Sequence, residues 1–429
     1  MLERIKKALA ECGCDAWQIT ETKRSGWEFY FIRRSLDQNR AVEEKTYSVE
    51  VFKYIDDKRF LGSASGVIAP TATDGEIAKN LSQLVYQASL VKNPAYTLVS
   101  KPVDVPEKKD AVDLKAISRD FIDAVLSVPE TPGEDVNSFE IFAGSVSRRF
   151  VNSNGVRYAC VYPSSTAEVV VNARNGSEEI ELYRFFTSGS CDKKELADQI
   201  KKAMTYGRDR LRAVPTPDLK TGDVVFSTSD AVQIYEYFLD RTAAGFKVRQ
   251  ISDWEIGKPV CDYTTGDRIT VRSLQSLKNS SKDYPVDPEG SVIRDRYLIK
   301  DGVVKNFWGS RQFSCYLGLE DSFSVANAEF TGGSATEDEI RSGDFLEVVE
   351  FSSFQVDSVS GDIAGEIRLG YLHRGGEVIP VTGGSVSGSM VRAASTMRFS
   401  KNTVQYDSRI VPSVTKLASL SIAGAAKAE

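Results

Sequence analysis

The stretch from Val224 to Gly245, VVFSTSDAVQIYEYFLDRTAAG, predicts a short buried strand, a turn and then an amphipathic helix. Ser227 and Asp230 have the spacing of a capping box, and Gly245 stands where such a helix would end. The apolar side chains recur at helical spacing and would share one face: Ala231, Ile234, Tyr235, Phe238 and Leu239. We therefore predict a helix that packs this face into a core. The helix contains no histidine, whereas a zinc-peptidase helix carries two of them on one face, next to a glutamate.

The composition is that of an ordinary globular protein. Of 429 residues, 41% are hydrophobic and 27% charged, which is enough apolar material for two or three domains. The net charge of −6 and the lack of a long basic cluster argue against direct contact with nucleic acid. No apolar run approaches the roughly 18 residues of a membrane span, and the first residues lack the apolar core of a signal peptide. We therefore expect a cytoplasmic protein without membrane contact, and the six scattered cysteines predict no disulfide framework.

The first 92 residues show an α+β pattern. Runs with strand character precede a helix that follows Thr73 and Glu76, which form a second capping-box pair. These runs are Ala16–Glu21, Trp27–Arg33, Thr46–Ile55 and Phe60–Ile68. We interpret residues 1–92 as an N-terminal α+β domain, with helices packed on one face of a sheet.

Residues 93–113 are interpreted as a linker, because they contain three prolines and a charged run. Residues 114–220 are interpreted as a middle α+β domain. It is predicted to hold a helix near 114–128, a β-meander over 136–186 and a second helix near 191–212. The pairs Asn154-Gly155 and Asn175-Gly176 predict type I′ hairpin turns within the meander.

Residues 221–429 are dominated by predicted strands, which Gly, Ser and Asp turns separate. The extended runs are Val292–Ile299, Val303–Trp308, Phe345–Gln355, Glu366–His373 and Glu377–Val381. The predicted fold class is therefore α+β, with N-terminal sheet-plus-helix domains followed by a strand-rich C-terminal domain.

The common catalytic motifs are missing or broken. His373 is the sole histidine and falls in a predicted strand, so neither a histidine-rich zinc site nor a Ser-His-Asp triad is indicated. Residues 62–66 and 384–388 look like G-x-S-x-G but have Ala or Val at the serine position. S-x-x-K at Ser413–Lys416 comes after K-T-G at Lys220–Gly222, the reverse of the order in penicillin-recognising enzymes. We therefore assign no catalytic residue and no metal ligand.

A succession of short phrases in the C-terminal half resembles the TldD/PmbA family. VDPEG at 286–290 is followed by the strand and turn IRDRYLIKDGVV at 293–304. SGDIAGEI at 360–367, GYLHRGGE at 370–377 and GGSVSG at 383–388 come next, before VP at 411–412 and LSIAG at 420–424. The order and the gaps are compatible with the family. In the N-terminal half, VEVFKYIDDKRFLGSASG at 49–66 and FVNSNGV at 150–156 are similar to the family's first and middle domains.

The family has two branches, and the resemblance implies which one this sequence follows. In the TldD branch, an H-E-x-x-x-H helix and a later cysteine together hold a metal for peptide hydrolysis. The corresponding helix here, Asp230–Leu239, has no histidine, and the corresponding late segment, Thr403–Pro412, has no cysteine. The sequence is therefore similar to the PmbA (TldE) branch, a partner subunit without the zinc motif. Zinc is expected in a TldD-like partner and no cofactor in this chain.

The leading hypothesis is a PmbA/TldE-like subunit that pairs with a TldD-like metallopeptidase, or with itself, and takes part in proteolysis of small or unfolded peptides. Such a subunit is expected to be inactive alone. Strand-rich domains bind extended peptides through edge pairing, so we place groove candidates on the polar positions of the helix: Ser229, Asp230, Gln233, Glu236 and Tyr237. The family's older label, modulator of DNA gyrase, fits poorly with direct DNA contact by an acidic chain.

Two alternatives stay open: a self-contained homodimeric peptidase with non-zinc chemistry, and a peptide-binding or assembly protein without a catalytic role. The roles of Asp287, Glu289 and His373 are also open. An acidic turn before a strand is ordinary turn chemistry, which favours a structural role for Asp287 and Glu289.

Overall fold

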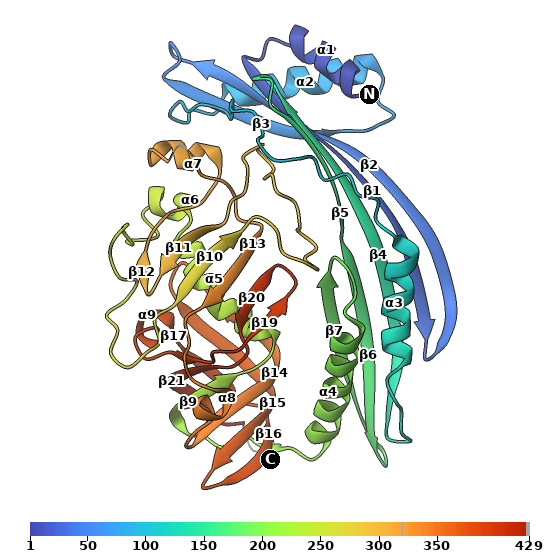
Figure 1. Cartoon of the computed structure of the whole chain (residues 1–429), viewed down its shortest axis with the longest axis vertical. Coiled ribbons are helices and arrows are strands. Elements are labelled where there is room, and N and C mark those ends of the chain that lie inside the picture. Colours follow the sequence, from blue (N-terminus) through green and yellow to red (C-terminus); the bar gives the residue numbers. More distant parts are fainter. Residues whose placement is uncertain (320, 426–429) are drawn as a thin grey trace.

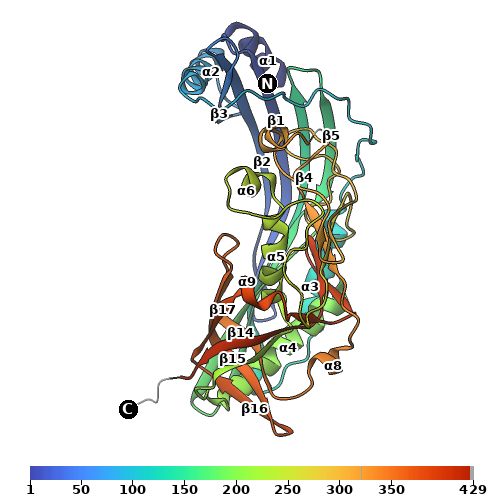
Figure 2. The same cartoon turned by 90° about the vertical axis from the view of Figure 1, so that its left-hand side faces the viewer.

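Strands dominate the computed structural model, which describes residues 1–319 and 321–425 (Figure 1). Strands make up 44% and helices 21% of the structure, and the strands form three sheets. The predicted α+β, strand-rich fold class is therefore confirmed. A long, curved sheet stands beside a C-terminal half that holds the other two sheets (Figures 1 and 2). No helix within the described ranges is long and apolar enough to cross a membrane.

The long sheet combines strands from both of the predicted N-terminal units. Its order is β3-β2-β1-β4-β6-β7, with β5 also paired to β4. β1 pairs antiparallel with β4, so residues from 1–92 and from 114–220 contribute to one sheet. The strands are β1 (Ala16–Ile32), β2 (Ser35–Ile55), β3 (Phe60–Ile68), β4 (Glu134–Asn152), β5 (Arg157–Pro163), β6 (Ser165–Asn175) and β7 (Glu178–Ser188).

The β1–β2 hairpin is much longer than its sequence predicts. The apolar pattern predicts two separate runs between residues 16 and 33, whereas β1 is one continuous strand and β2 extends over Ser35–Ile55. Charged residues that look like breaks in the sequence instead form pairs across the two strands. Lys23 lies 3.1 Å from Glu43 and Lys45 lies 2.7 Å from Glu21. Residues 20–26 and 43–46 are polar at successive positions, so these parts of the ribbon lack the alternation on which strand prediction depends.

Two pairs of helices cover one face of the long sheet, one pair toward each end (Figure 1). α1 (Leu2–Glu11) and α2 (Asp74–Ser89) enclose a core that includes Ile19 of β1. α3 (Leu114–Leu126) and α4 (Lys193–Leu211) enclose a second core that includes Phe31 of the same strand. Ile19 and Phe31 are an even number of residues apart, so both side chains point to the same face of the sheet.

Local capping and turn signals were partly right. Thr73 and Glu76 form the predicted capping box, because the Thr73 hydroxyl accepts from the Glu76 N–H and the Glu76 carboxylate accepts from the Thr73 N–H. The two Asn-Gly pairs mark the β4–β5 and β6–β7 connections, as predicted. Their predicted type I′ conformation is wrong, since only Gly155 (φ 83°) and Gly176 (φ 63°) adopt positive φ, whereas type I′ needs it at both residues.

The C-terminal half contains a closed ring of strand pairings. β9 pairs with β21, β21 with β17, β17 with β15, β15 with β14, and β14 again with β9. β8, β16 and β18 attach to this ring. The strands are β8 (Val214–Pro215), β9 (Lys220–Phe226), β14 (Phe345–Val356), β15 (Asp362–Arg374), β16 (Glu377–Thr382), β17 (Ser385–Ser389), β18 (Arg398–Phe399) and β21 (Thr415–Ala423).

The third sheet has the order β12-β11-β10-β13-β20-β19. Its strands are β10 (Thr270–Leu274), β11 (Arg296–Lys300), β12 (Val303–Val304), β13 (Asn327–Thr331), β19 (Thr403–Tyr406) and β20 (Arg409–Pro412). The helical segments of this half are a 3₁₀ turn (Ser229–Ala231), α5 (Val232–Arg241), α6 (Ala244–Val248), α7 (Arg311–Tyr316), α8 (Glu337–Ile340) and α9 (Met390–Ala393).

α5 is the central helix of the C-terminal core, as the opening stretch of sequence predicts. All five residues of the predicted apolar face are at most 2% exposed. Tyr235 shows how the helix joins the two sheets: its ring lies 5.4 Å from that of Phe330 on β13, and its hydroxyl lies 2.6 Å from that of Thr415 on β21. The predicted caps are wrong. The Ser227 hydroxyl donates to Glu347 (2.5 Å) instead of capping the helix, and Gly245 falls within α6.

Candidate functional site

A cleft lies between the free edge of the long sheet and the C-terminal half. It encloses about 760 Å³. Residues 183–188 of β7 and the start of α4 line one side, and residues 227–230, 349–351 and 404–407 line the other. β7 and the β19–β20 hairpin stand next to each other in Figure 1. The cleft is therefore built where two strand edges and the start of the α5 region meet.

A second hollow of about 380 Å³ continues this cleft along α5. Ser229, Asp230 and Tyr406 line both spaces, and Gln233 and Glu236 of α5 line the second. Four of the five groove candidates from the sequence are thus brought together on one surface.

The fifth candidate, Tyr237, is not part of this surface. Its side chain is buried, with its ring 5.4 Å from Phe238 and 6.2 Å from Trp254. The simple helical wheel places Tyr237 beside the polar positions, but α5 is packed on more than one face because it lies between two sheets. We therefore remove Tyr237 from the candidate site.

An ion pair crosses the cleft between β7 and β14. The Arg184 guanidinium binds the Glu350 carboxylate, and their side chains are 21% and 12% exposed. Burial raises the pKa of Glu350, and Arg184 opposes this shift. Burial also raises the pKa of Asp230, whose contact with the Thr228 hydroxyl is long at 3.4 Å. The sequence does not reveal the Arg184–Glu350 pair, because the two residues are far apart in the chain.

A second ion pair joins α5 to the segment 403–412. The Arg409 guanidinium on β20 binds the Glu236 carboxylate of α5 and lines the same hollow. Arg409 also donates to the backbone carbonyls of Ala326 (2.8 Å) and Ser408 (3.0 Å). This arginine is fixed by several acceptors, and our reading of the sequence did not single it out.

His373 lies outside this cleft. Its ring stacks on Phe345 at 4.1 Å, and its Nε2 lies 3.9 Å from Glu347. Burial lowers the pKa of His373, which favours the neutral ring. The arrangement is that of a packed side chain at the end of the β14–β15 pair.

Asp287 organises the loop that contains the VDPEG phrase. Its carboxylate is 1% exposed and accepts hydrogen bonds from the backbone N–H groups of Glu289, Ser291 and Ser324, each at 2.9 Å. Glu289 in turn accepts from the Arg311 N–H at the start of α7 (2.7 Å). These contacts are those of a structural loop.

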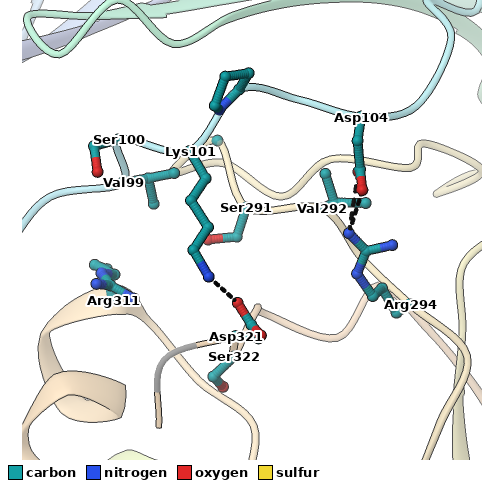
Figure 3. Close-up of a pocket in the computed structure, with 12 residues that line it drawn as sticks. Val99, Ser100, Lys101, Asp104, Ser291, Val292, Arg294, Arg311, Asp321 and Ser322 are labelled. Atoms are coloured by element: carbon teal, nitrogen blue, oxygen red, sulfur yellow. Dashed lines mark hydrogen bonds and ion pairs between the residues drawn. The ribbon is translucent and has the colours of Figure 1, made fainter. Parts of the chain in front are cut away.

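The proline-rich segment 93–113 is held against this part of the C-terminal half. Figure 3 shows two of the ion pairs that hold it, Lys101 to Asp321 (2.7 Å) and Arg294 to Asp104 (2.8 Å). They border a small pocket of about 160 Å³. The segment predicted as a linker therefore runs along the interface between the long sheet and the C-terminal half.

Glu289 is expected to make stability depend on pH. Burial raises the pKa of its carboxyl to about 7, from an ordinary value of 4.5. The folded state therefore keeps this proton to a higher pH than the unfolded state, so the contribution of Glu289 to stability falls between about pH 4.5 and 7. Glu289→Gln keeps an acceptor for the Arg311 N–H but cannot titrate.

Urea unfolding of both proteins at pH 5 and pH 7.5 measures this contribution. We expect the wild type to lose more stability than Glu289→Gln over that interval. An equal change in the two proteins would contradict the assigned pKa.

Comparisons with known proteins agree with this architecture. Residues 220–424 match the family model of the PmbA/TldA metallopeptidase C-terminal domain. TldE from Thermococcus kodakarensis shares the fold with a TM-score of 0.77 and 15% identity, covering 99% of this chain and 100% of that one. A proposed modulator of DNA gyrase from Thermotoga maritima has a TM-score of 0.77 and 14% identity, covering 99% and 100%. Another from Bacteroides thetaiotaomicron has 0.76 and 15%, covering 99% and 98%. No curated protein matches the chain.

The matched domain and the fold define a peptidase-related α+β protein. Residues 220–424 carry the C-terminal domain of the PmbA/TldD family, and the family predicted from the sequence is thereby confirmed. The three structural relatives are under 25% identical, so they establish the fold alone.

The metal that the name of the matched domain implies does not fit the residues of this cleft. Zinc sites are built mainly from histidine and cysteine, and neither lines the hollow beside α5. One cysteine, Cys191, lines the larger cleft next to the start of α4. Across residues 1–319 and 321–425, no group of three or more His, Cys, Asp or Glu side chains is placed to bind a metal. Glu236, the carboxylate of α5 in this hollow, is already bound to the Arg409 cation.

Proposed function

We propose that this chain is a PmbA/TldE-like subunit that joins a metal-bearing TldD-like peptidase and helps it to process small or unfolded peptides. Within that assembly, this chain contributes a peptide-holding surface and the partner contributes the hydrolytic site. The chain alone is inactive.

The Glu236–Arg409 ion pair is the observation that carries this proposal. By the family resemblance, α5 and the segment 403–412 correspond to the two elements that supply the metal ligands in the TldD branch. In this chain the same two elements also meet, but they meet through a carboxylate and a guanidinium. The two elements therefore lie side by side, but an ion pair joins them and neither supplies a histidine or cysteine ligand.

The charge of Arg409 supports a subunit that does not take a divalent cation at this place. Arginine side chains in proteins carry a permanent positive charge. A divalent cation bound to Glu236 would lie close to this positive charge, and the two would repel each other. The negative charge of the Glu236 carboxylate is also balanced by Arg409, which makes it a weaker ligand for a metal ion.

Mixing the two subunits tests the proposal. We would measure hydrolysis of an unfolded peptide by this chain, by a TldD-like protein, and by both together, each with and without a chelator. We expect hydrolysis to rise at least tenfold on mixing over the sum of the separate rates, and to be lost with the chelator.

Other outcomes separate the alternatives. Hydrolysis by this chain alone, whether or not the chelator stops it, would establish a self-contained peptidase and contradict the proposal. A partner that is equally active alone and in the mixture would leave this chain as a binding or assembly protein without a role in hydrolysis.

A further inference from the structure

β7 presents an unpaired strand edge to the cleft. Within the described part of the chain it pairs only with β6, which lies on its other side. The direction of the free groups follows from β6. The N–H of Ser164, the residue before β6, donates to the carbonyl of Gly144 in β4 (2.9 Å). Even-numbered residues of β6 therefore bond to β4, and odd-numbered residues bond to β7. Val169 is paired with Arg184 of β7.

The backbone groups of Tyr183, Phe185 and Thr187 therefore point away from β6, into the cleft. The Tyr183 carbonyl already accepts a hydrogen bond from the Arg184 side chain at 3.0 Å, which leaves Phe185 and Thr187 as the residues to consider. In residues 1–319 and 321–425, no hydrogen bond reaches the N–H or C=O of Phe185 or Thr187 on that side. All three residues line the cleft.

A second unpaired edge faces the same space. β19 pairs only with β20, among the residues that the structure describes. The Ser413 N–H donates to the Asn402 carbonyl (2.9 Å), so residues 402, 404 and 406 face β20 and the backbone of Gln405 faces outward. Gln405 lines the cleft opposite β7.

The charges that line the cleft are mostly negative. Its charged side chains are five carboxylates and two cations: Asp192, Glu195, Asp230, Glu350, Asp407, Arg184 and Lys202. Arg184 is committed to Glu350. Among the described residues, the Asp230 carboxylate has one hydrogen bond, a long one from the Thr228 hydroxyl, and Asp230 is the acid that lines both hollows. The cleft thus has two features: free backbone groups that can bond to the backbone of any peptide, and a lining with an excess of negative charge.

We propose that the cleft binds an extended, cationic peptide as an added strand on the free edge of β7, with Lys or Arg side chains directed toward Asp230. The backbone groups of Phe185 and Thr187 supply register without regard to sequence, and the carboxylates select for positive charge. Residues 183–188 span roughly 20 Å, which accommodates about six residues of peptide. This inference rests on the proposed function, for which it names the site and the class of substrate.

Three labelled peptides of equal length test the site on the isolated full chain by fluorescence anisotropy. One alternates Lys with Ser and Val, the second has Glu in place of Lys, and the third is the Lys peptide with alternate backbone amides methylated. We expect the second and third to bind about tenfold or more weakly than the first. Equal binding of all three would overturn the proposal.

Two variants locate the binding. Thr187→Pro removes an N–H from the free edge without touching the β6 ladder, and is expected to weaken the Lys peptide about tenfold. Asp230→Asn is expected to weaken it about threefold or more. Asp198→Asn is the matched control, since Asp198 lies on α4 and pairs with Lys194 outside the cleft. Circular dichroism checks that each variant is folded. If Thr187→Pro is not folded, the binding of Asp230→Asn and of the methylated peptide decides whether the proposal holds.

The binding test and the mixing test can contradict the two proposals independently of each other. Charge-selective and amide-dependent binding without hydrolysis on mixing would support this site and contradict the subunit function. Hydrolysis on mixing, with binding that is indifferent to charge and to backbone methylation, would support the subunit function and overturn this site.

Discussion

Gly62→Ala is expected to lower the free energy of unfolding by about 3 kcal/mol or more. Gly62 lies in β3, where the C-terminal end of α2 crosses the strand. A Cβ at this position would lie 1.9 Å from the Ala88 carbonyl oxygen and 2.4 Å from that of Val91. Both atoms belong to backbone, so no side-chain rotation relieves the clash, and the end of α2 has to move. Urea unfolding followed by circular dichroism measures the loss.

Gly66→Ala on the same strand is the matched control for this prediction. A Cβ there meets only the methyl groups of Leu84, at 3.3 and 3.4 Å, and these can shift. We expect its stability to stay within about 0.5 kcal/mol of the wild type. Equal losses in the two variants would show that the close approach of α2 to β3 does not explain the glycine.

Asp287→Ala is expected to cost about 3 kcal/mol of stability. The substitution leaves three backbone N–H groups, those of Glu289, Ser291 and Ser324, without the acceptor that each now has at 2.9 Å. Each buried unsatisfied donor costs on the order of 1 kcal/mol or more. Removing a carboxylate whose pKa is raised by burial offsets part of the cost.

Asp287→Asn separates shape from hydrogen bonding in the same loop. Its amide keeps one carbonyl oxygen as an acceptor, so we expect a loss smaller than that of alanine. The measurement is again urea unfolding, at pH 7. If Asp287→Ala were as stable as the wild type, the VDPEG loop would be held by something other than this carboxylate. Gly290 shows that the same loop is also constrained by its backbone, because its φ is 89° and a Cβ there would lie 2.4 Å from the Phe150 ring.

Local patterns predicted the helices well because each helix depends on residues close in sequence. α2 begins at the capping box, and the apolar face of α5 is buried as its spacing predicts. The same reasoning failed where a distant residue competes. Ser227 has the spacing of a cap, but its hydroxyl bonds Glu347 from β14 instead.

The arrangement of strands could not be predicted from spacing. That β1 pairs with β4, and that β7 and β19 are left as edges, is decided by contacts between segments far apart in the chain. The candidate site shows the same division. The polar positions of α5 were found from helical periodicity, whereas Arg184, Glu350 and Arg409 reach the cleft through the tertiary fold.

The closed ring of the C-terminal half has a consequence for synthesis on the ribosome. β9 is made first but lies between β14 and β21, so both of its neighbours are translated later. At roughly 5–20 residues per second, about 10 to 40 seconds pass between β9 and the last strand, β21. During that time the edge of Val224–Phe226 that pairs with β21 has no partner, and the ring closes only when the final strand emerges. A nascent chain with such an edge is a natural client for a chaperone that shields exposed strands.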